Sequence, residues 1–287
     1  MTVAHSGAGF RAAAPVDPAR FDLPASAGGQ SLTFRGVSLS FGGVSAVRDI
    51  DLSVAAGEIR AVIGPNGAGK SSLINLATGL YAPQAGWINI GERSFTTVPT
   101  RRLARLGVAR TFQNLALFKA LSVRDNIAAG LSHRARASFI EHVAGIGRAR
   151  ADAAKVHEAV DRVIELLDLN AVSHRAAGTL PYGLQKRVEL GRALVDRPRL
   201  LLLDEPMAGM TATEKQDMAG FVRAARDRFG TTIVLVEHDI GIVMGLSDRI
   251  AVLDHGTKIA DGTPAEVAAD QAVIDAYLGV AHEEIAA

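Results

Sequence analysis

Gly64-Pro65-Asn66-Gly67-Ala68-Gly69-Lys70-Ser71 fits the pattern G-x-x-x-x-G-K-[ST], and this stretch decides the fold of the chain. An apolar run at 59–63 precedes it, and a helix-like segment that starts at Ser72 follows it. A strand, a glycine-rich loop and a helix in this order are the context in which the pattern binds phosphate. The sequence therefore predicts a strand–loop–helix unit that holds a nucleotide.

Each residue type in this loop has a physical reason. Glycines let successive backbone N–H groups turn inward around phosphate oxygens, and the following helix adds the positive end of its dipole. Lys70 adds a point charge, and the Ser71 hydroxyl is a ligand for Mg²⁺. The alternative, a glycine-rich turn without a ligand, does not explain the Lys and the Ser. The expected nucleotide-binding residues here are Gly64, Pro65, Asn66, Gly67, Ala68, Gly69, Lys70, Ser71 and Ser72.

Two adjacent acids follow a second apolar run, 200–203. Four apolar residues predict a buried strand, and Asp204 at its carboxyl end is placed to hold Mg²⁺ directly or through water. Glu205 comes one residue later, where a carboxylate can orient or deprotonate an attacking water. The alternative is a strand that ends in a solvated acidic turn, and the upstream phosphate loop disfavours it.

Three single residues extend this site. Gln113 follows a strand, and its carbonyl is expected to reach Mg²⁺ or the attacking water; otherwise it is an ordinary loop amide. His238 ends a strand on the same side and is expected to hydrogen-bond a γ-phosphate, although a lone His there is more often structural. Phe41 is either a stacking surface for adenine or a core residue.

A second glycine turn precedes a helix at 180–190. The N-terminus of a helix attracts anions, so Gly183 and Gln185 are expected to contact phosphate as well. We therefore place both residues in the nucleotide-binding set, apart from the first loop.

Composition narrows the class of protein. The chain has 287 residues, a net charge of +1 and no cysteine, which excludes disulfides and thiolate metal sites and gives no argument for nucleic acid. No apolar run reaches the roughly 18 residues that span a bilayer. Residues 1–30 and 281–287 are expected to be tails, with the folded part at 31–280.

The pattern along the chain predicts an α/β fold. Segments 32–40 and 50–54 alternate like antiparallel strands, whereas 200–203 and 233–236 look like doubly covered parallel strands. Between them, 115–178 is expected to be a helical insertion, with a capping start at Ser122 and an apolar stripe on Val156, Val160, Val163 and Leu167. The expected architecture is a mixed sheet with an antiparallel β subdomain and a helical subdomain.

In this order and spacing the motifs resemble the ATPase subunit of ABC transporters, over residues 31 to about 280. The resemblance implies a P-loop NTPase core that binds ATP and Mg²⁺ and hydrolyses ATP. It assigns Gly64–Ser72 to the Walker A motif, Asp204 and Glu205 to Walker B, and Gln113 to the Q-loop. The other assignments are Phe41 to the A-loop, Leu180–Gln185 to the signature, Ala208–Thr211 to the D-loop and His238 to the switch histidine. Catalysis would then fall to Glu205, His238, Gln113 and Lys70, with Ser71, Gln113 and Asp204 on the metal.

Four shorter stretches resemble the ATPases of high-affinity branched-chain amino acid importers; related subunits serve urea, amide and aromatic-acid uptake. They are Thr111–Gln113, Leu180–Gly183, Glu237–Asp239 and Val273–Gly279. This resemblance implies integral membrane permease subunits, and indirectly a periplasmic or extracellular solute-binding protein. It also implies a second ATPase, identical or paralogous, in a head-to-tail dimer, and a peripheral location on the cytoplasmic face of the inner membrane.

Two rival functions remain. An exporter ATPase, such as one for lipopolysaccharide, carries similar motifs. A soluble ABC ATPase acting on DNA would need hundreds of coiled-coil residues between Lys70 and Asp204, which 134 residues separate here, and a ribosome factor would carry two cassettes.

Some residues depart from the general pattern. Pro181 and Tyr182 replace the Ser and the first Gly of the usual signature L-S-G-G-Q, and Thr211 stands where the D-loop usually has Asp or Asn. Pro181 removes a hydroxyl and a backbone donor, which leaves the Gly183 amide and the helix N-terminus to face phosphate.

Two surface features each allow two interpretations. Arg101, Arg102, Arg105 and Arg110 are expected to form a solvated helix face, with contact to a permease or to lipid headgroups as the alternative. Leu115, Phe118 and Leu121 either form an apolar seat for a permease helix beside Gln113 or are buried within the insertion.

Overall fold

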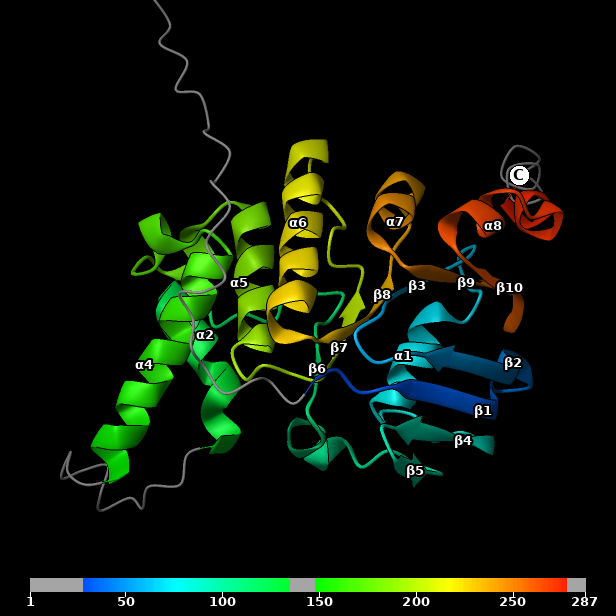
Figure 1. The fold of residues 1–287 in the computed structure, drawn as a ribbon, viewed down its shortest axis with the longest axis horizontal. Coiled ribbons are helices and arrows are strands. Elements are labelled where there is room, and N and C mark those ends of the chain that lie inside the picture. Colours follow the sequence, from blue (N-terminus) through cyan, green and yellow to red (C-terminus); the bar gives the residue numbers. More distant parts are fainter. Residues whose placement is uncertain (1–27, 135–147, 278–287) are drawn as a thin grey trace, which may run out of the picture.

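The computed structural model describes residues 28–134 and 148–277, which form two sheets and several surrounding helices (Figure 1). The four-stranded antiparallel sheet has the order β2-β1-β4-β5. Its strands are β1 (Leu32–Phe41), β2 (Val44–Val54), β4 (Ala85–Ile90) and β5 (Arg93–Phe95). The two expected antiparallel strands are confirmed, and the second begins six residues earlier than its alternation indicated.

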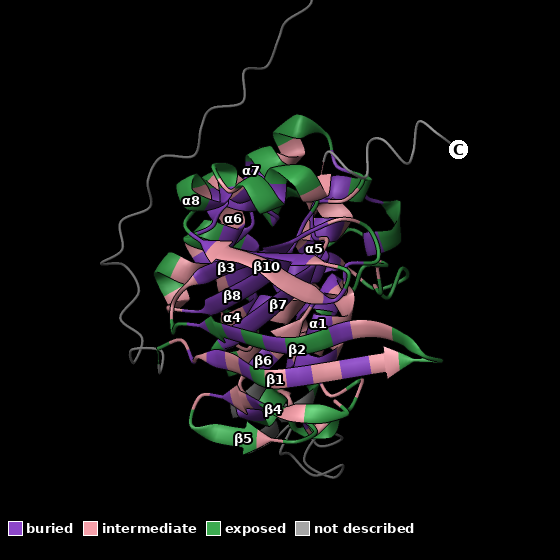
Figure 2. Ribbon diagram, turned by 90° about the vertical axis from the view of Figure 1, so that its right-hand side faces the viewer, coloured by how far each residue is buried: buried purple, intermediate pink, exposed green. Residues whose placement is uncertain are grey.

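A six-stranded mixed sheet has the order β10-β9-β3-β8-β7-β6. Its parallel strands are β3 (Ile59–Ile63), β6 (Val108–Arg110), β7 (Leu200–Asp204), β8 (Thr232–Val236) and β9 (Arg249–Asp254), and β10 (Thr257–Gly262) is antiparallel to β9. Every residue of β3, β7 and β8 is buried, as doubly covered parallel strands require. Figure 2 shows this central buried layer with exposed residues on the outer helices and strands.

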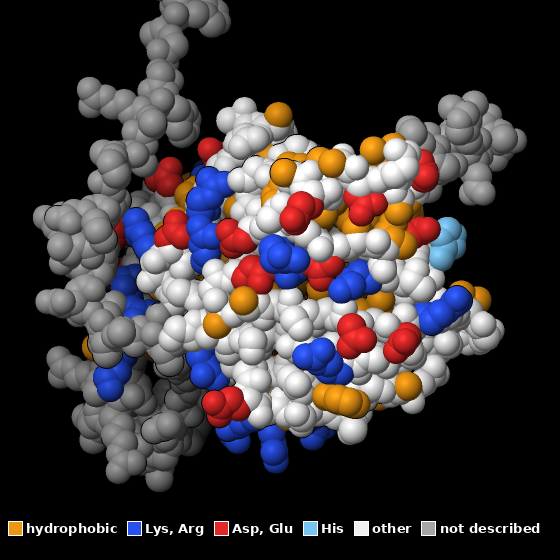
Figure 3. All heavy atoms as spheres, turned by 45° about the vertical axis from the view of Figure 1, so that its right-hand side comes forward, with side chains coloured by type: hydrophobic (Ala, Val, Ile, Leu, Met, Phe, Trp, Pro, Cys, Tyr) orange, Lys and Arg blue, Asp and Glu red, His pale blue; other side chains and the backbone are white. Residues whose placement is uncertain are grey.

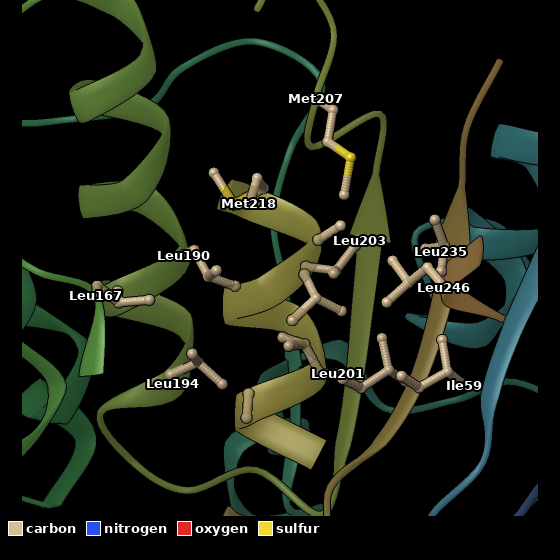
Figure 4. Close-up of a cluster of buried hydrophobic side chains, with 14 of the residues drawn as sticks. Ile59, Leu167, Leu190, Leu194, Leu201, Leu203, Met207, Met218, Leu235 and Leu246 are labelled. Carbon is tan, nitrogen blue, oxygen red and sulfur yellow. The ribbon is translucent and has the colours of Figure 1, made fainter. Parts of the chain in front are cut away.

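Strand alternation divides the core into two parts. Leu201 and Leu203 join one apolar cluster with the large helices, whereas Leu200 and Leu202 join a second cluster with the antiparallel sheet. The helix α1 (Lys70–Ala77) packs in the second cluster. The first cluster contains α5 (Tyr182–Leu194), α6 (Ala212–Phe229), α7 (Ile240–Leu246) and α8 (Pro264–Ala268). Figure 4 shows Leu190 and Leu194 of α5 beside Met218 of α6, with Leu201 and Leu203 of β7 nearby.

The expected helical insertion is present. It contains α2 (Val123–Ala128), η4 (Ala129–Arg134), α4 (Arg148–Leu166), η5 (Asn170–Val172) and η6 (Ala177–Thr179). Ser122 caps α2 by accepting from the Asp125 amide, and Val160 and Val163 of α4 are buried, as the pattern predicted. Since α5 packs against both α2 and α4, the helical layer continues beyond residue 178.

Two short helices, η2 (Thr100–Arg102) and η3 (Ala104–Leu106), lead into β6. Gln30, which the sequence placed in the N-terminal tail, is buried and donates to the Leu106 carbonyl at 2.9 Å. The rest of that expected tail, up to residue 27, and the expected tail 281–287 lie outside the described residues.

Within the described residues, no helix combines the length and the apolar character needed to cross a bilayer. On the face in Figure 3, acidic and basic side chains are interspersed, which is the pattern of an ordinary solvated surface.

Candidate active site

The parallel strands bring the predicted residues to one edge of the sheet. β7 pairs with β8, and β8 pairs with β3. The carboxyl ends of parallel strands meet at the same edge, where open α/β sheets bind their ligands. Gly64 follows β3, Glu205 follows β7 and Glu237 follows β8, so three separate motifs converge there.

The phosphate loop needs glycine at two positions. Gly64 has φ of 147°, and a Cβ there would lie 2.0 Å from the Leu253 carbonyl oxygen. Gly69 has φ of 101°, and its Cβ would lie 2.2 Å from the Ala46 oxygen. Because Gly69 provides no side-chain cap, the first N–H groups of α1 are available to an anion.

Lys70 is folded onto its own loop. Its Nζ donates to the carbonyl oxygens of Gly64 at 2.7 Å and Pro65 at 2.8 Å, and the residue is buried. Burial lowers the pKa of Lys70, and the nearby charges of Glu205 and Asp204 oppose that shift. The ammonium is thus held beside the loop by neutral carbonyl groups.

Asp204 is a buried carboxylate that has two partners. The Ser71 hydroxyl donates to Oδ1 at 3.4 Å, and a guanidinium nitrogen of Arg110 lies 3.6 Å from Oδ2. Burial raises the pKa of Asp204, and the charge of Arg110 opposes that rise. An acid that burial makes costly to ionise favours a cation nearby.

The expectation that Arg110 belongs to a solvated basic face is wrong. Arg110 ends strand β6, and its guanidinium donates to Asn75 Oδ1 and Thr78 Oγ1, both at 3.0 Å, while lying 4.5 Å from the Phe112 ring centroid. The spacing of the four arginines fits one helix, but a strand turns the fourth side chain inward. Arg101, Arg102 and Arg105 are exposed.

Glu205 joins two other motifs. Its Oε1 lies 2.7 Å from His238 Nε2, and its Oε2 accepts from Gln113 Nε2 at 3.2 Å. Glu205 has φ of 49°, an uncommon conformation for a non-glycine residue, at the end of β7. The structure therefore brings Gln113, Glu205 and His238 into direct contact, as the sequence reasoning predicted for a common site.

Glu237 was not identified as a functional residue from the sequence. It is 4% exposed, and it accepts from the Met207 amide at 2.8 Å and from the His238 amide at 3.2 Å. Burial raises its pKa, and these two hydrogen bonds oppose the rise. Glu237 thus ties the turn after Glu205 to the backbone of His238. An acid that ends an all-buried strand was the available signal.

The oxygen donors fit Mg²⁺ only together with a phosphate ligand. Asp204 offers a carboxylate, Ser71 a hydroxyl and Gln113 an amide oxygen, which are hard donors of the kind that Mg²⁺ prefers. In the described ranges no three His, Cys, Asp or Glu side chains form a group that could hold a metal. Mg²⁺ commonly takes one or two carboxylates plus substrate phosphates, and this donor set suits that arrangement.

Gly183 and Gln185 lie apart from the cluster around Glu205. Gly183 is buried, and a Cβ there would lie 2.2 Å from Glu214 Oε1. Gln185 Nε2 donates to the Leu180 carbonyl at 2.8 Å, across the first turn of α5. Among the described residues, no hydrogen bond or ion pair joins either residue to Lys70, Asp204 or Glu205.

Phe41 is at the surface. Its side chain is 46% exposed, and its ring lies edge-on to Tyr81 with 5.0 Å between the centroids. A ring this exposed is not a tightly packed core residue, and one of its faces is free to contact another group. Stacking on adenine stays a prediction.

A cavity of about 470 Å³ lies where α5 faces β6 and the loop after it. Phe112 and Phe118, which are 47% and 55% exposed, line it together with Arg110, Glu189 and Arg192. Leu121 is exposed and Leu115 partly buried, and neither belongs to this lining. Of the three residues expected to form an apolar seat, the structure places Phe118 alone in the cavity wall.

Two family models match the chain. The model described as "ABC transporter" matches residues 47–208, and the one described as "Branched-chain amino acid ATP-binding cassette transporter" matches residues 257–283. The first match contains the phosphate loop, Gln113, Asp204 and Glu205. The second contains β10, α8 and the segment after them.

Two curated relatives cover almost their whole length. The chain is 38% identical over 253 residues to the high-affinity branched-chain amino acid transport ATP-binding protein LivG of Salmonella typhimurium, covering 87% of this chain and 98% of LivG. It is 37% identical, with the same coverage, to the corresponding protein BraF of Pseudomonas aeruginosa. A crystal structure of an ABC transporter ATP-binding cassette in its ADP conformation is 29% identical, with a TM-score of 0.75 over 87% of this chain and 99% of that one.

Proposed function

The chain belongs to the ATP-binding subunits of ABC transporters, and we propose that it hydrolyses ATP to drive an importer of branched-chain amino acids or related small polar solutes. The fold is that of a P-loop ABC ATPase. The residue roles, the partners and the transported solute belong to this proposal.

The contact of Glu205 with Gln113 and His238 carries the proposal. Glu205 is the proposed base, which orients and deprotonates the water that attacks the γ-phosphorus of ATP. His238 contacts one carboxylate oxygen, and its proposed role is to hydrogen-bond a γ-phosphate oxygen when ATP is bound. Gln113 holds the other oxygen, so both arms of the carboxylate are oriented before substrate binds.

Lys70 and the first turn of α1 would take the phosphates. Exchanging the carbonyl groups of Gly64 and Pro65 for phosphate oxygens gives the Lys70 ammonium an anionic partner. Asp204, Ser71 and Gln113 would hold Mg²⁺, which neutralises charge that develops on the β- and γ-phosphate oxygens. The products are ADP and inorganic phosphate.

Glu205→Gln tests the catalytic assignment. The variant keeps the shape of the side chain and should bind ATP with wild-type affinity, but its steady-state hydrolysis should fall by about 100-fold or more. Glu92→Gln, at an exposed carboxylate on the antiparallel sheet, is the matched control and should hydrolyse ATP normally. Turnover of Glu205→Gln within a few-fold of wild type would reject Glu205 as the base.

A second ATPase is proposed to complete each site. The signature helix α5 and the phosphate-loop helix α1 pack in different core clusters, on opposite faces of the six-stranded sheet. The N-terminus of α5 would therefore serve the nucleotide of a neighbour in a head-to-tail dimer. ATP should convert Glu205→Gln to a dimer in light scattering if the second copy is identical; a monomer that dimerises only with a paralogue would indicate a heterodimer.

The cavity lined by Phe112 and Phe118 is the proposed seat of a permease segment. Two exposed aromatic rings give an apolar surface, and Gln113 lies beside them in the same loop. Phe118→Asp should abolish copurification with the permease while ATP binding and the melting temperature stay normal. Trp87→Asp, at an exposed aromatic of β4, should copurify normally. Wild-type yield of permease with Phe118→Asp would contradict this seat.

The proposed solute rests on the C-terminal match at 257–283 and on the named relatives. We place the subunit on the cytoplasmic face of the inner membrane, with a solute-binding protein on the other side. Deleting the gene in its own host should reduce leucine uptake, which the wild-type gene should restore and the Glu205→Gln gene should not. Normal leucine uptake after deletion, with loss of another solute, would reassign the substrate.

A further inference from the structure

The loop that carries Gln113 is attached to the helical layer. Thr111 still belongs to the sheet, because its amide donates to the Leu202 carbonyl at 2.9 Å. From Gln113 onward the bonding partners change: the carbonyls of residues 113 and 116 accept from α5, and those of 118 and 121 accept from Asn126 of α2. The Gln113 side chain nevertheless reaches across to Glu205 at the end of β7.

Lys186 is the buried cation at this attachment. Its side chain is 1% exposed, and Nζ donates to the Gln113 carbonyl at 3.3 Å. The same Nζ lies 3.8 Å from Glu189 Oε2 and 5.9 Å from the ring centroid of Tyr182. Lys186 lies one turn before Leu190, which Figure 4 shows in the apolar core, so an apolar side chain would satisfy packing at this position.

Tyr182 connects Lys186 to the D-loop, in the turn after Glu205. It replaces the first glycine of the usual signature, and its ring lies over the turn after Glu205, where a Cβ on Gly209 would be 3.2 Å from Tyr182 Cε1. Lys186 therefore contacts the ring of a signature residue that packs on the D-loop, and the backbone of the residue that orients Glu205.

Glu189 supplies the negative charge that faces Lys186, and its burial makes the ionised carboxylate costly. It is 3% exposed, and burial raises its pKa, while the charges of Lys186 and Arg192 and hydrogen bonds from the backbone amides of Ala116 and Phe112 oppose that rise. Replacing a buried ion pair with apolar residues is often neutral or stabilising. A buried pair whose charged atoms are 3.8 Å apart contributes little to stability, and both of its members contact the backbone of the loop that carries Gln113.

We propose that Lys186, with Glu189 as its countercharge, is a positioning residue that holds the Gln113 backbone so that the Gln113 amide faces Glu205. This proposal rests on the hydrolytic role proposed for Glu205. It means that α5 acts directly on the catalytic site of its own chain, through the contact of Lys186 with the Gln113 carbonyl. The position of the signature helix then sets the orientation of the catalytic carboxylate through one ammonium group.

The test separates stability from positioning with two variants. Lys186→Met removes the buried ammonium that faces Glu189 and should lower both the melting temperature and hydrolysis. Lys186→Met/Glu189→Met removes the whole pair and should recover the melting temperature. Its kcat should stay about tenfold or more below wild type, with the ATP dissociation constant within about twofold, because a small misplacement of a catalytic group is costly.

Two further readouts show whether Lys186 acts through Gln113. Amide hydrogen exchange at residues 113–116, measured without nucleotide, should be faster in the double variant and unchanged in Arg187→Met, which removes a neighbouring α5 cation paired with exposed Asp217. In a Gln113→Ala background, Lys186→Met/Glu189→Met should lower kcat by less than twofold, since the group that it positions is already gone.

Recovery of wild-type kcat together with the melting temperature in the double variant would overturn the proposal and leave the pair a structural one. Unchanged hydrogen exchange at 113–116, or a full additional loss in the Gln113→Ala background, would also overturn it. Failure of the proposed function itself is distinguishable, since it would appear as normal hydrolysis by Glu205→Gln.

Discussion

Two clusters of buried charge differ in whether their groups satisfy one another. In the first, Arg60 lies between Glu58 and Asp261: its Nε is 2.6 Å from Glu58 Oε1, and its other nitrogens bond Asp261 and, at 2.9 Å, the Ser53 carbonyl. These contacts join β2, β3 and β10, and the Arg60 side chain is 3% exposed. In this cluster, which we call complete, the charged groups pair with one another within the chain.

The cluster at the phosphate loop is incomplete. Lys70 bonds neutral carbonyl oxygens rather than an acid, and burial lowers its pKa. Burial also raises the pKa of Asp204, whose nearest cation is 3.6 Å away. Charges that are buried without close partners cost stability and favour a ligand that supplies them. The charge cluster around Arg60 should therefore contribute to stability, and the charge cluster at the phosphate loop should contribute to ligand binding.

Breaking the complete cluster should have the largest effect. Arg60→Met removes the cation that pairs with both Glu58 and Asp261, and it should lower the free energy of unfolding by about 3–5 kcal/mol. ATP affinity of the folded protein, measured by calorimetry, should stay within a few-fold of wild type. Arg249→Met is the control, because Arg249 is an exposed arginine that also pairs with Asp261. It should lower the free energy of unfolding by about 0–1 kcal/mol. A loss below 1 kcal/mol for Arg60→Met would erase the contrast between the clusters.

Breaking the incomplete cluster should reverse the pattern. Lys70→Ala should weaken ATP binding by about 1.5–3 kcal/mol, or roughly 10- to 150-fold, because a charged hydrogen-bond donor to phosphate is gone. Its melting temperature without nucleotide should equal or exceed that of wild type, since a costly buried ammonium has been removed. Lys258→Ala, at a partly exposed lysine, should bind ATP normally. Unchanged ATP binding by Lys70→Ala would contradict the assignment.

The smallest expected effect depends on pH. Burial acts to raise the pKa of Asp261, but the hydrogen bond from Lys258 and the charge of Arg60 outweigh it and hold the pKa below the ordinary 3.8. A lowered carboxylate pKa stabilises the fold above the unfolded value, and this contribution is lost as the pH falls through 3.8 toward the folded value.

Asp261→Asn should therefore cost about 1 kcal/mol in urea unfolding at pH 7, and the difference from wild type should narrow below pH 4. A difference that stays constant from pH 7 to pH 3 would mean that the Asp261 charge contributes nothing to stability.

Local sequence predicted which residues lie close together where one motif lies on one strand end. The phosphate loop, Asp204, Glu205 and His238 each follow an apolar run, and the sheet brings parallel strand ends together. The same reasoning misplaced Arg110, because the charge pattern of four arginines carries no information on where a helical turn gives way to a strand. It also missed Glu237, which accepts from the amide of the next residue, His238, and from the amide of Met207, 30 residues earlier in the chain.

The sequence by itself determined the fold family and the order of the elements, because glycine loops, buried strands and acids at strand ends are local properties. The tertiary structure alone decided which charges are satisfied. Arg60 bonds a second acid, Asp261, that is 201 residues away in the chain, and Glu205 contacts Gln113 across 92 residues of chain. Such pairings depend on strand order and helix packing, which set distances that no local pattern contains.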